Sequence, residues 1–222
     1  MAWGTASADV SHTVAAKTEA SVKASHQAKA PTYTGKVLQS TRNGMVQGYV
    51  KNHSLIWKGI PYGRAERWKA PTDVKAWNGI FDATKTGPIA IQGAIGKTKG
   101  SEDCLNLDIF RPNTKEKNLP VLFFIHGGNN QSGAADQVNW QKFVEREHVV
   151  AISINHSLGA LGFNPLPALS MVRLKKIPVT LLYWILLKAW TGRKKILPAL
   201  AEILTISRLQ AFPLVDVTSW HC

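Results

Sequence analysis

The sequence predicts an α/β fold in which a small antiparallel hairpin precedes the start of a mostly parallel central sheet. Three observations lead to this prediction: an Asn-Gly turn between two short β-prone runs, two later runs that are almost wholly apolar, and a short amphipathic segment between those two runs. Apolar runs of this kind are typical of strands covered by helices on both faces. The order strand, helix, strand then favours an α/β sheet.

The predicted hairpin opens the folded part of the chain. Residues 37–40 and 45–50 flank the turn Arg42-Asn43-Gly44. An Asn-Gly pair between two short β-prone runs is a strong signal of a β-hairpin. Residues 55–62 are expected to form a third short strand, which ends at a loop rich in glycine and proline.

The central sheet is expected from the residues that follow. Residues 105–110 carry apolar side chains at alternating positions, and residues 121–125 and 149–154 form the two apolar runs. Between these runs, residues 138–146 can form a short amphipathic helix. These four segments predict the first strands of the central sheet and one helix that covers it.

Composition divides the chain into three parts. Residues 1–35 are rich in Ala, Ser, Thr and Lys and lack the large apolar side chains that would offset the entropy of ordering, so we expect a flexible leader. Residues 170–222 contain 8 of the 27 basic side chains but only 2 of the 14 acidic ones. They also contain ten leucines and one glycine. The prediction is therefore a leader, an α/β domain over 36–169, and a basic, leucine-rich tail.

The net charge of +13 by itself favours a nucleic-acid or anionic-membrane partner. However, the basic residues show no helix-turn-helix pattern, no zinc-ligand spacing and no interleaved aromatic side chains, so we expect no nucleic-acid partner. The apolar run at residues 177–187 has basic flanks, yet it is too short for a membrane span, which needs about twenty residues. Association of the tail with a membrane surface is the remaining membrane interpretation.

Metal and cofactor chemistry has no support in the sequence. The two cysteines, Cys104 and Cys222, allow at most one disulfide and form no framework. The sequence contains no metal-ligand cluster and no phosphate-binding loop. We therefore expect no metal site and no cofactor.

A glycine loop carries the main functional signal. His126-Gly127-Gly128 follows the apolar run 121–125 directly, and open α/β sheets bind their ligands at the carboxyl ends of strands. Paired glycines let backbone N–H groups converge on one point, as the binding of an oxyanion in acyl transfer requires. For this motif alone, a tight turn without function is the alternative interpretation.

Four sequence blocks set the loop in a wider pattern. The chain reads "GIPYGRAERWKAP" at 59–71, "SEDCLNLDIFRP" at 101–112, "PVLFFIHGG" at 120–128 and "VVAISINHSLGALGF" at 149–163. With these blocks in this order, the chain closely resembles the type-B carboxylesterases, the family of cholinesterase-like α/β-hydrolases. The resemblance covers residues 36–169. It implies a truncated, amino-terminal portion of the α/β-hydrolase fold and a parent enzyme that acts on small-molecule esters.

The resemblance also implies roles for individual residues. The oxyanion hole corresponds to Gly127, Gly128 and Asn129, where asparagine replaces the third glycine of the family. Asparagine tolerates a left-handed backbone, but its side chain narrows the pocket. Arg67 and Glu102 match a family pair that is expected to form a buried ion pair with a structural role.

Further positions depart from the family pattern. Cys104 stands where many members have one half of a disulfide, but no cysteine precedes it, so we expect a buried, unreactive thiol. At residues 155–158 the chain has Asn-His-Ser-Leu where the family usually has Asn-Tyr-Arg-Leu, and the lost arginine changes the support around the site. His148 and His156 are expected on the surface or in loops, and neither takes a catalytic position.

The catalytic triad is missing from the sequence. An esterase of this type needs a serine in a Gly-x-Ser-x-Gly elbow, then an acid and a histidine. No such elbow occurs in the 222 residues, and the family spacing would place it near residues 208–214. Read from the third base of each codon, however, Gln210–Val215 permits Gly-Phe-Ser-Ala-Gly, and Trp184-Ile185 encodes an aspartate. We therefore hypothesise that the reading frame shifts near Ser170 and that residues 170–222 are out of frame.

The sequence thus predicts a fragment of a serine carboxylic-ester hydrolase that is inactive as this chain, because the nucleophile, acid and base are missing. Two alternatives stay open: a non-catalytic cholinesterase-like binding or adhesion module, and a basic tail that associates with a membrane surface. Ala6-Ser7-Ala8 resembles the end of a signal peptide, which favours a secreted protein over a cytoplasmic one. No residue identifies the particular ester or the oligomeric state.

Overall fold

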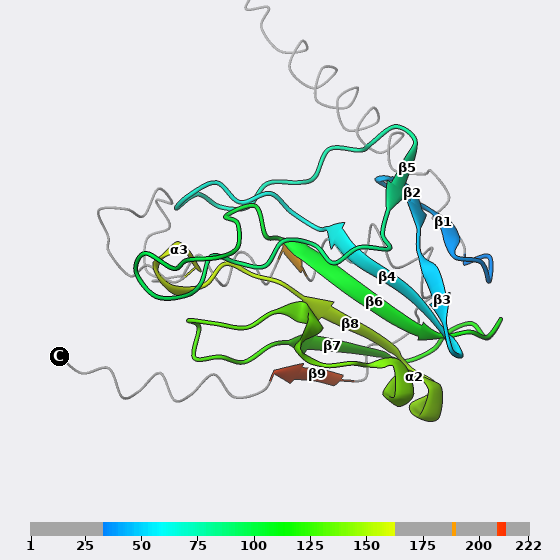
Figure 1. Ribbon diagram of the computed structural model, residues 1–222. Helices are drawn as coiled ribbons and strands as arrows, with labels where there is room; N and C mark the ends of the chain where they lie inside the picture. The colour runs from blue at the N-terminus through cyan, green and yellow to red at the C-terminus, as the bar shows by residue number, and fades with distance from the viewer. Residues whose placement is uncertain (1–32, 163–187, 190–207, 212–222) are drawn as a thin grey trace, which may run out of the picture. The chain divides into compact units, whose positions relative to one another are not determined.

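A computed structural model (Figure 1) describes residues 33–162, 188–189 and 208–211. The predicted leader and the predicted tail therefore lie almost wholly outside the described residues. The described residues contain one sheet of three strands and one sheet of six strands.

The smaller sheet contains the predicted hairpin. β1 (Leu38–Thr41) and β2 (Gly44–Gln47) pair antiparallel, with Thr41 opposite Gly44. The Thr41 hydroxyl donates to Gly44 O over 2.8 Å and closes the turn. The hairpin prediction is confirmed. The sequence does not predict β5 (Ile80–Asp82), which joins β2 in parallel, because three residues are too few to show a period.

Gly48 ends the hairpin and lets the chain pass to the larger sheet. The strand expected over 45–50 is broken at Gly48, and only glycine fits there, because a Cβ would lie 2.5 Å from Cδ1 of the Trp57 indole. β3 (Tyr49–Lys51) then pairs antiparallel with β4 (Ser54–Pro61) in the larger sheet. One predicted strand therefore becomes two strands in different sheets.

The larger sheet has the strand order β3-β4-β6-β8-β7-β9 (Figure 1). Its other members are β6 (Asn106–Pro112), β7 (Val121–Ile125), β8 (Val150–Ile154) and β9 (Arg208–Ala211). Pairing is antiparallel from β3 to β8 and parallel from β8 through β7 to β9. The parallel part begins with β7 and β8 because α2 (Gln141–Glu147) lies in the crossover that connects them.

The interior of the larger sheet explains the two apolar runs. In β7, Phe123 and Phe124 belong to two different apolar clusters, and in β8 the same holds for Ile152 and Ala151. Successive side chains of a strand point to opposite faces, so both faces of β7 and β8 are covered. Val144 of α2 is part of the cluster that contains Phe124. Burial on both faces is the reason that these strands show no polar alternation.

A β-bulge in β4 lies opposite a buried carboxyl group on β6. The register between β4 and β6 shifts between Trp57 and Ile60, and Gly59 takes a left-handed φ of 65°. The Gly59 N–H donates to Asp108 Oδ1 over 2.8 Å. Asp108 is fully buried on β6, and desolvation raises its pKa to about 6 although this hydrogen bond opposes the shift.

Three short helices also lie within residues 33–162. The helix expected over 138–146 is present as α2, which ends at His148 in a left-handed conformation with φ 50°. η1 (Ala135–Gln137) precedes α2, and α3 (Gly159–Gly162) follows β8. Within the described ranges, no helix has the length and apolar character that a membrane crossing requires.

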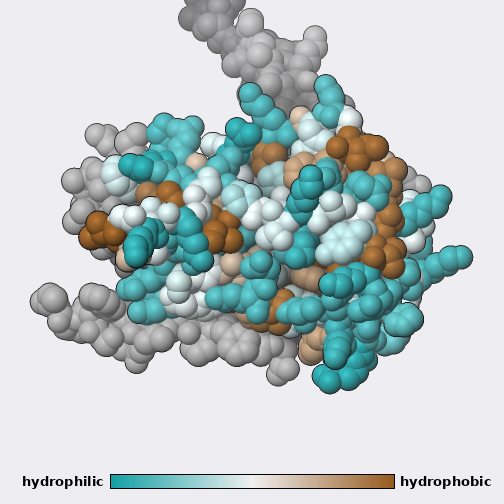
Figure 2. Space-filling model, in the orientation of Figure 1, coloured by the Kyte–Doolittle hydropathy of each residue, from teal (hydrophilic) through white to brown (hydrophobic). Residues whose placement is uncertain are grey.

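The surface of one face is mostly hydrophilic, with apolar side chains gathered near the edge that carries β2, β3 and β5 (Figures 1 and 2). Val50 of β3 and Ile80 of β5 are among the exposed large apolar side chains. Single exposed apolar side chains are common on protein surfaces. These residues therefore identify no partner.

Candidate oxyanion site at the end of β7

The glycine loop, residues 126–133, leaves the carboxyl end of β7 and forms a left-handed turn. Gly128, Asn129 and Asn130 have positive φ angles of 130°, 53° and 54°. The N–H groups of Gln131 and Ser132 donate to Gly128 O over 3.0 and 3.1 Å and close the turn. Asn129 thus takes the left-handed backbone that the family's glycine would favour. Gly128 and Asn129 are exposed, so a ligand can approach their backbone.

Gly127 and Gly128 differ in their tolerance of a side chain. A Cβ on Gly128 would lie 2.0 Å from Ser132 O, whereas a Cβ on Gly127 meets nothing within 4 Å. We expect Gly128→Ala to lower the free energy of unfolding by about 2 kcal/mol, and Gly127→Ala to change it by less than about 0.5 kcal/mol. Urea unfolding followed by tryptophan fluorescence measures both variants, and equal effects would contradict this loop geometry.

Two buried imidazole rings pack beside the loop. The rings of His126 and His156 stack with centroids 4.4 Å apart and an interplanar angle of 25°. His126 Nδ1 lies 3.0 Å from Gly127 O, and a Cβ on Gly133 would lie 2.3 Å from the same nitrogen. His156 lies in the loop between β8 and α3, as expected, but it is 3% exposed and so is not a surface residue, whereas His148 is exposed. His156 is buried because it follows the buried strand β8 and stacks on a ring thirty residues earlier.

Burial keeps these two rings neutral. Desolvation lowers the pKa of His156 to about 3, with a smaller contribution from His126, and desolvation also lowers the pKa of His126. Within the part of the chain that the structure describes, His126 Nε2 and His156 Nδ1 have no hydrogen-bond partner. Among the residues that the structure describes, no carboxylate orients either ring as it would a catalytic histidine, and His126 packs against the loop.

Buried amide side chains hold the segment that follows the loop. Asn155 Oδ1 accepts the Ala135 N–H over 2.8 Å, and Asn155 Nδ2 donates to Asn106 Oδ1 over 2.9 Å. The Tyr62 hydroxyl donates to Asn155 O over 2.7 Å, and burial raises the pKa of Tyr62 well above its usual value. These hydrogen bonds connect the ends of β4, β6 and β8 in a low-dielectric interior, where they strengthen one another.

β9 ends level with the start of the glycine loop. Ala211, its last residue, pairs with Ile125, the last residue of β7. In an α/β-hydrolase sheet, the turn that follows such a strand carries the nucleophile. The residues after Ala211 lie outside the described ranges, and their sequence contains no Gly-x-Ser-x-Gly.

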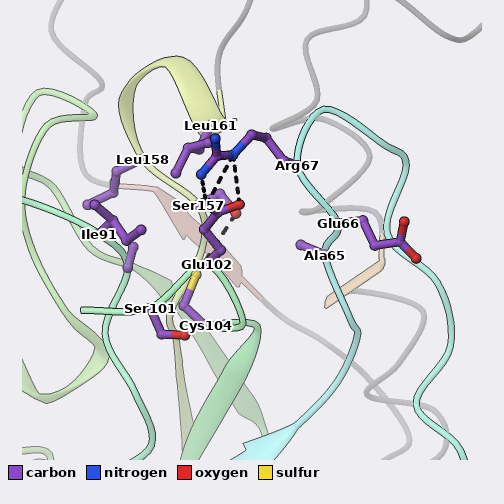
Figure 3. Close-up of a pocket in the computed structure, with 11 residues that line it drawn as sticks. Ala65, Glu66, Arg67, Ile91, Ser101, Glu102, Cys104, Ser157, Leu158 and Leu161 are labelled. Carbon is purple, nitrogen blue, oxygen red and sulfur yellow. Dashed lines mark hydrogen bonds and ion pairs between the residues drawn. The ribbon is translucent and has the colours of Figure 1, made fainter.

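Arg67 and Glu102 form an ion pair (Figure 3), in which Nε and Nη2 of the guanidinium donate to the carboxylate. These hydrogen bonds raise the pKa of Arg67 and lower the pKa of Glu102. The pair is not buried, contrary to the expectation, since the two side chains are 55% and 31% exposed. Residues 66–70 are all exposed, which brings Arg67 to the surface. An exposed pair of this kind contributes little to stability.

The ion pair lies at a small hollow that is separate from the glycine loop. The hollow is lined by Ala65, Glu66, Arg67, Ala90, Ile91, Ser101, Glu102, Cys104, Ser157, Leu158 and Leu161 (Figure 3). Cys104 Sγ lies 3.9 Å from Ser157 Oγ, and burial raises the pKa of the thiol to about 11. The predicted burial of Cys104 is confirmed, and the thiol is protonated at neutral pH. None of residues 126–133 lines this hollow, so it is not the candidate oxyanion site.

Some residues that support the loop have no signal in the sequence. Gln92, Asn106 and Asn155 bind backbone or amide groups far along the chain, and a single amide side chain has no pattern that predicts such a partner. Among the described residues, no three His, Cys, Asp or Glu side chains gather in a group that could hold a metal ion.

Buried parallel strands joined through a helix, with a glycine loop at the carboxyl end of the first, are the features of an α/β-hydrolase. The model of the carboxylesterase family matches residues 36–167, more than half of the chain. The chain belongs to the carboxylesterase family.

Individual relatives match the same part of the chain. It is 36% identical over 137 residues to the para-nitrobenzyl esterase of Bacillus subtilis, a match that covers 56% of this chain and 28% of that protein. It is 31% identical over 160 residues to the acetylcholinesterase of Bungarus fasciatus, with 62% and 26% covered. A solved carboxylesterase structure from Geobacillus stearothermophilus matches with a TM-score of 0.67 and 28% identity, over 76% of this chain and 36% of that one. The matched region spans about a quarter of these curated relatives.

Proposed function

We propose that this chain is the amino-terminal part of a serine hydrolase of small-molecule carboxylic esters and that residues 127–129 supply the oxyanion hole of that enzyme. The observation that carries this proposal is the position of Gly128 and Asn129. Both are exposed, with positive φ, directly after a parallel strand that lies within the family match. Backbone N–H groups at such a place stabilise the negative charge that develops on an ester carbonyl oxygen.

In the parent enzyme, a serine attacks the ester carbonyl carbon, and a histidine that an acid orients takes the serine proton. The carbonyl oxygen becomes an oxyanion, which accepts hydrogen bonds from the N–H groups of Gly128 and Asn129. When this intermediate collapses, the bond to the ester's alcohol oxygen breaks and the alcohol leaves with the proton from the histidine. Water, deprotonated by the same histidine, then hydrolyses the acyl-enzyme, which releases the carboxylic acid and returns the proton to the serine. This chain contributes the oxyanion donors and the packing that holds them, and the other groups belong to the continuation of the fold.

The 222-residue chain is proposed to be inactive, because its sequence contains no Gly-x-Ser-x-Gly elbow. We expect its hydrolysis of p-nitrophenyl acetate and butyrate to equal that of a Gly128→Pro variant. The measurement is the release of p-nitrophenolate by equal concentrations of the two purified proteins. Turnover by the chain that exceeds the variant's would contradict this proposal.

A frameshift near Ser170 accounts for the missing elbow. The family match ends at residue 167, close to the point where glycine becomes rare and leucine frequent. Sequencing the source DNA from the Pro165 codon onward tests this idea. A single added or missing base that restores the elbow supports it, and a corrected chain should then hydrolyse p-nitrophenyl esters, whereas its serine→alanine variant should not.

The same missing elbow also favours a second candidate, a non-catalytic binding or adhesion module with the cholinesterase-like fold. Such a module keeps the fold without the nucleophile. DNA that continues the family pattern in a neighbouring frame with another residue at the serine position would support this candidate and contradict the hydrolase.

A further inference from the structure

The candidate oxyanion loop is held at its end by a side chain from another part of the chain. Gln92 Oε1 accepts the Gly133 N–H over 3.0 Å, and Gln92 Nε2 donates to Gly133 O over 2.9 Å. Both backbone groups of one loop residue are thus bound by one amide. The two residues are 41 positions apart in the sequence, so this contact exists only in the folded chain.

Gln92 is itself fixed on a short hairpin. Its backbone N–H donates to Lys99 O over 2.9 Å and its backbone O accepts the Lys99 N–H over 2.9 Å. Gln92 Nε2 also donates to Ala90 O over 3.1 Å. The amide therefore uses its oxygen and its nitrogen in hydrogen bonds that fix its orientation.

Gly133 has no room to move toward the His126 side. A Cβ on Gly133 would lie 2.3 Å from His126 Nδ1 and 2.6 Å from Gly127 O. Gly133 is thus in close contact with the start of its own loop, while the Gln92 amide binds its N–H and its C=O. Through Gly133, Gln92 acts on the loop that carries Gly127 and Gly128.

We propose that Gln92 is a positioning residue of the oxyanion loop, which it holds through paired hydrogen bonds to Gly133. The assignment of residues 127–129 as oxyanion donors rests on the proposed function, whereas the experiment below does not depend on it. Gln92 touches no reacting atom in this arrangement. It limits the orientations that the N–H groups of Gly127, Gly128 and Asn129 adopt, and preorganised donors are the effective ones.

Hydrogen exchange of the 222-residue chain, measured by mass spectrometry, tests the proposal. Gln92→Met keeps the length of the side chain and removes both hydrogen bonds to Gly133, together with the one to Ala90 O. We expect residues 126–134 to exchange about tenfold faster, as the loss of two ordinary hydrogen bonds implies, while β6 and β8 keep their rates. Gln92→Glu keeps an acceptor for the Gly133 N–H, so its effect on the loop should be smaller.

Gln137→Met is the matched control, because Gln137 is exposed and lies outside the loop. It should leave the exchange of residues 126–134 unchanged. Equal acceleration of the loop, β6 and β8 in Gln92→Met would show a general stabilising role and overturn the proposal, as would an unchanged loop. Neither result depends on ester hydrolysis, so a failure here is separate from a failure of the proposed function.

Discussion

His156→Phe is expected to reduce the loss of stability that this chain undergoes in mild acid. A histidine in the unfolded chain has a pKa near 6.5, whereas burial lowers the pKa of folded His156 to about 3. Between these values the unfolded state binds more protons than the folded state, so stability falls as the pH falls below 6.5. For His156 alone this loss is about 2 kcal/mol at pH 5.

Phenylalanine retains a ring that can stack on His126 and takes up no proton. The variant should therefore match the unchanged chain within about 1 kcal/mol at pH 7 and exceed it at pH 5. Urea midpoints at the two pH values, followed by tryptophan fluorescence, measure the difference. His53→Phe is the control, because His53 is exposed, and it should retain the full loss. If His156→Phe lost as much stability between pH 7 and pH 5 as the unchanged chain, the result would contradict a buried, neutral His156 ring.

Asp108→Asn is expected to stabilise the chain by about 2 kcal/mol at pH 8. Desolvation raises the pKa of folded Asp108 to about 6, above its ordinary value of 3.8. Between these values the folded state binds more protons than the unfolded state, so this residue lowers stability as the pH rises from about 4 to about 6. Above pH 6 the whole penalty is present, and asparagine removes it.

The structure indicates that asparagine fits at this position. Its side-chain oxygen can still accept the Gly59 N–H that Asp108 Oδ1 accepts over 2.8 Å. Within the described residues, Asp108 Oδ2 has no hydrogen-bond partner, so the new amide nitrogen breaks no bond, although its own unpaired N–H groups reduce the gain. Urea midpoints at pH 8 and pH 4 should show a gain at pH 8 that is absent at pH 4. Asp103→Asn is the control, because Asp103 is exposed. A comparable gain in this control would contradict the attribution of the gain to the burial of Asp108.

The two groups act in opposite directions between pH 4 and pH 6. On acidification in this range, protonation of Asp108 in the folded state adds stability, while His156 removes it. On acidification, His156→Phe should therefore lose less stability than the unchanged chain, and Asp108→Asn should lose more. The dependence that remains in the double variant includes a contribution from His126, whose pKa burial also lowers.

The strands and the glycine loop are predictable because their signals are local. The Asn-Gly turn, the apolar runs that became β7 and β8, and the helix between them each depend on neighbouring residues. The same holds for the left-handed Asn129, since asparagine tolerates that backbone in any fold. Gly48 is the exception among the early strands, because the Trp57 indole that fills its side-chain space comes from another strand.

The amino-acid sequence by itself determined the family, the first hairpin, the buried strands β7 and β8 and the residues of the candidate oxyanion loop, because motifs and hydrophobic periods are properties of short segments. Only the tertiary structure decided that His156 is buried on His126, that the Arg67–Glu102 pair is exposed and that Gln92 binds Gly133. Each of these depends on two segments that lie about thirty or more residues apart. Burial and hydrogen bonding between distant segments are set by the packing of the whole sheet, which no local pattern contains.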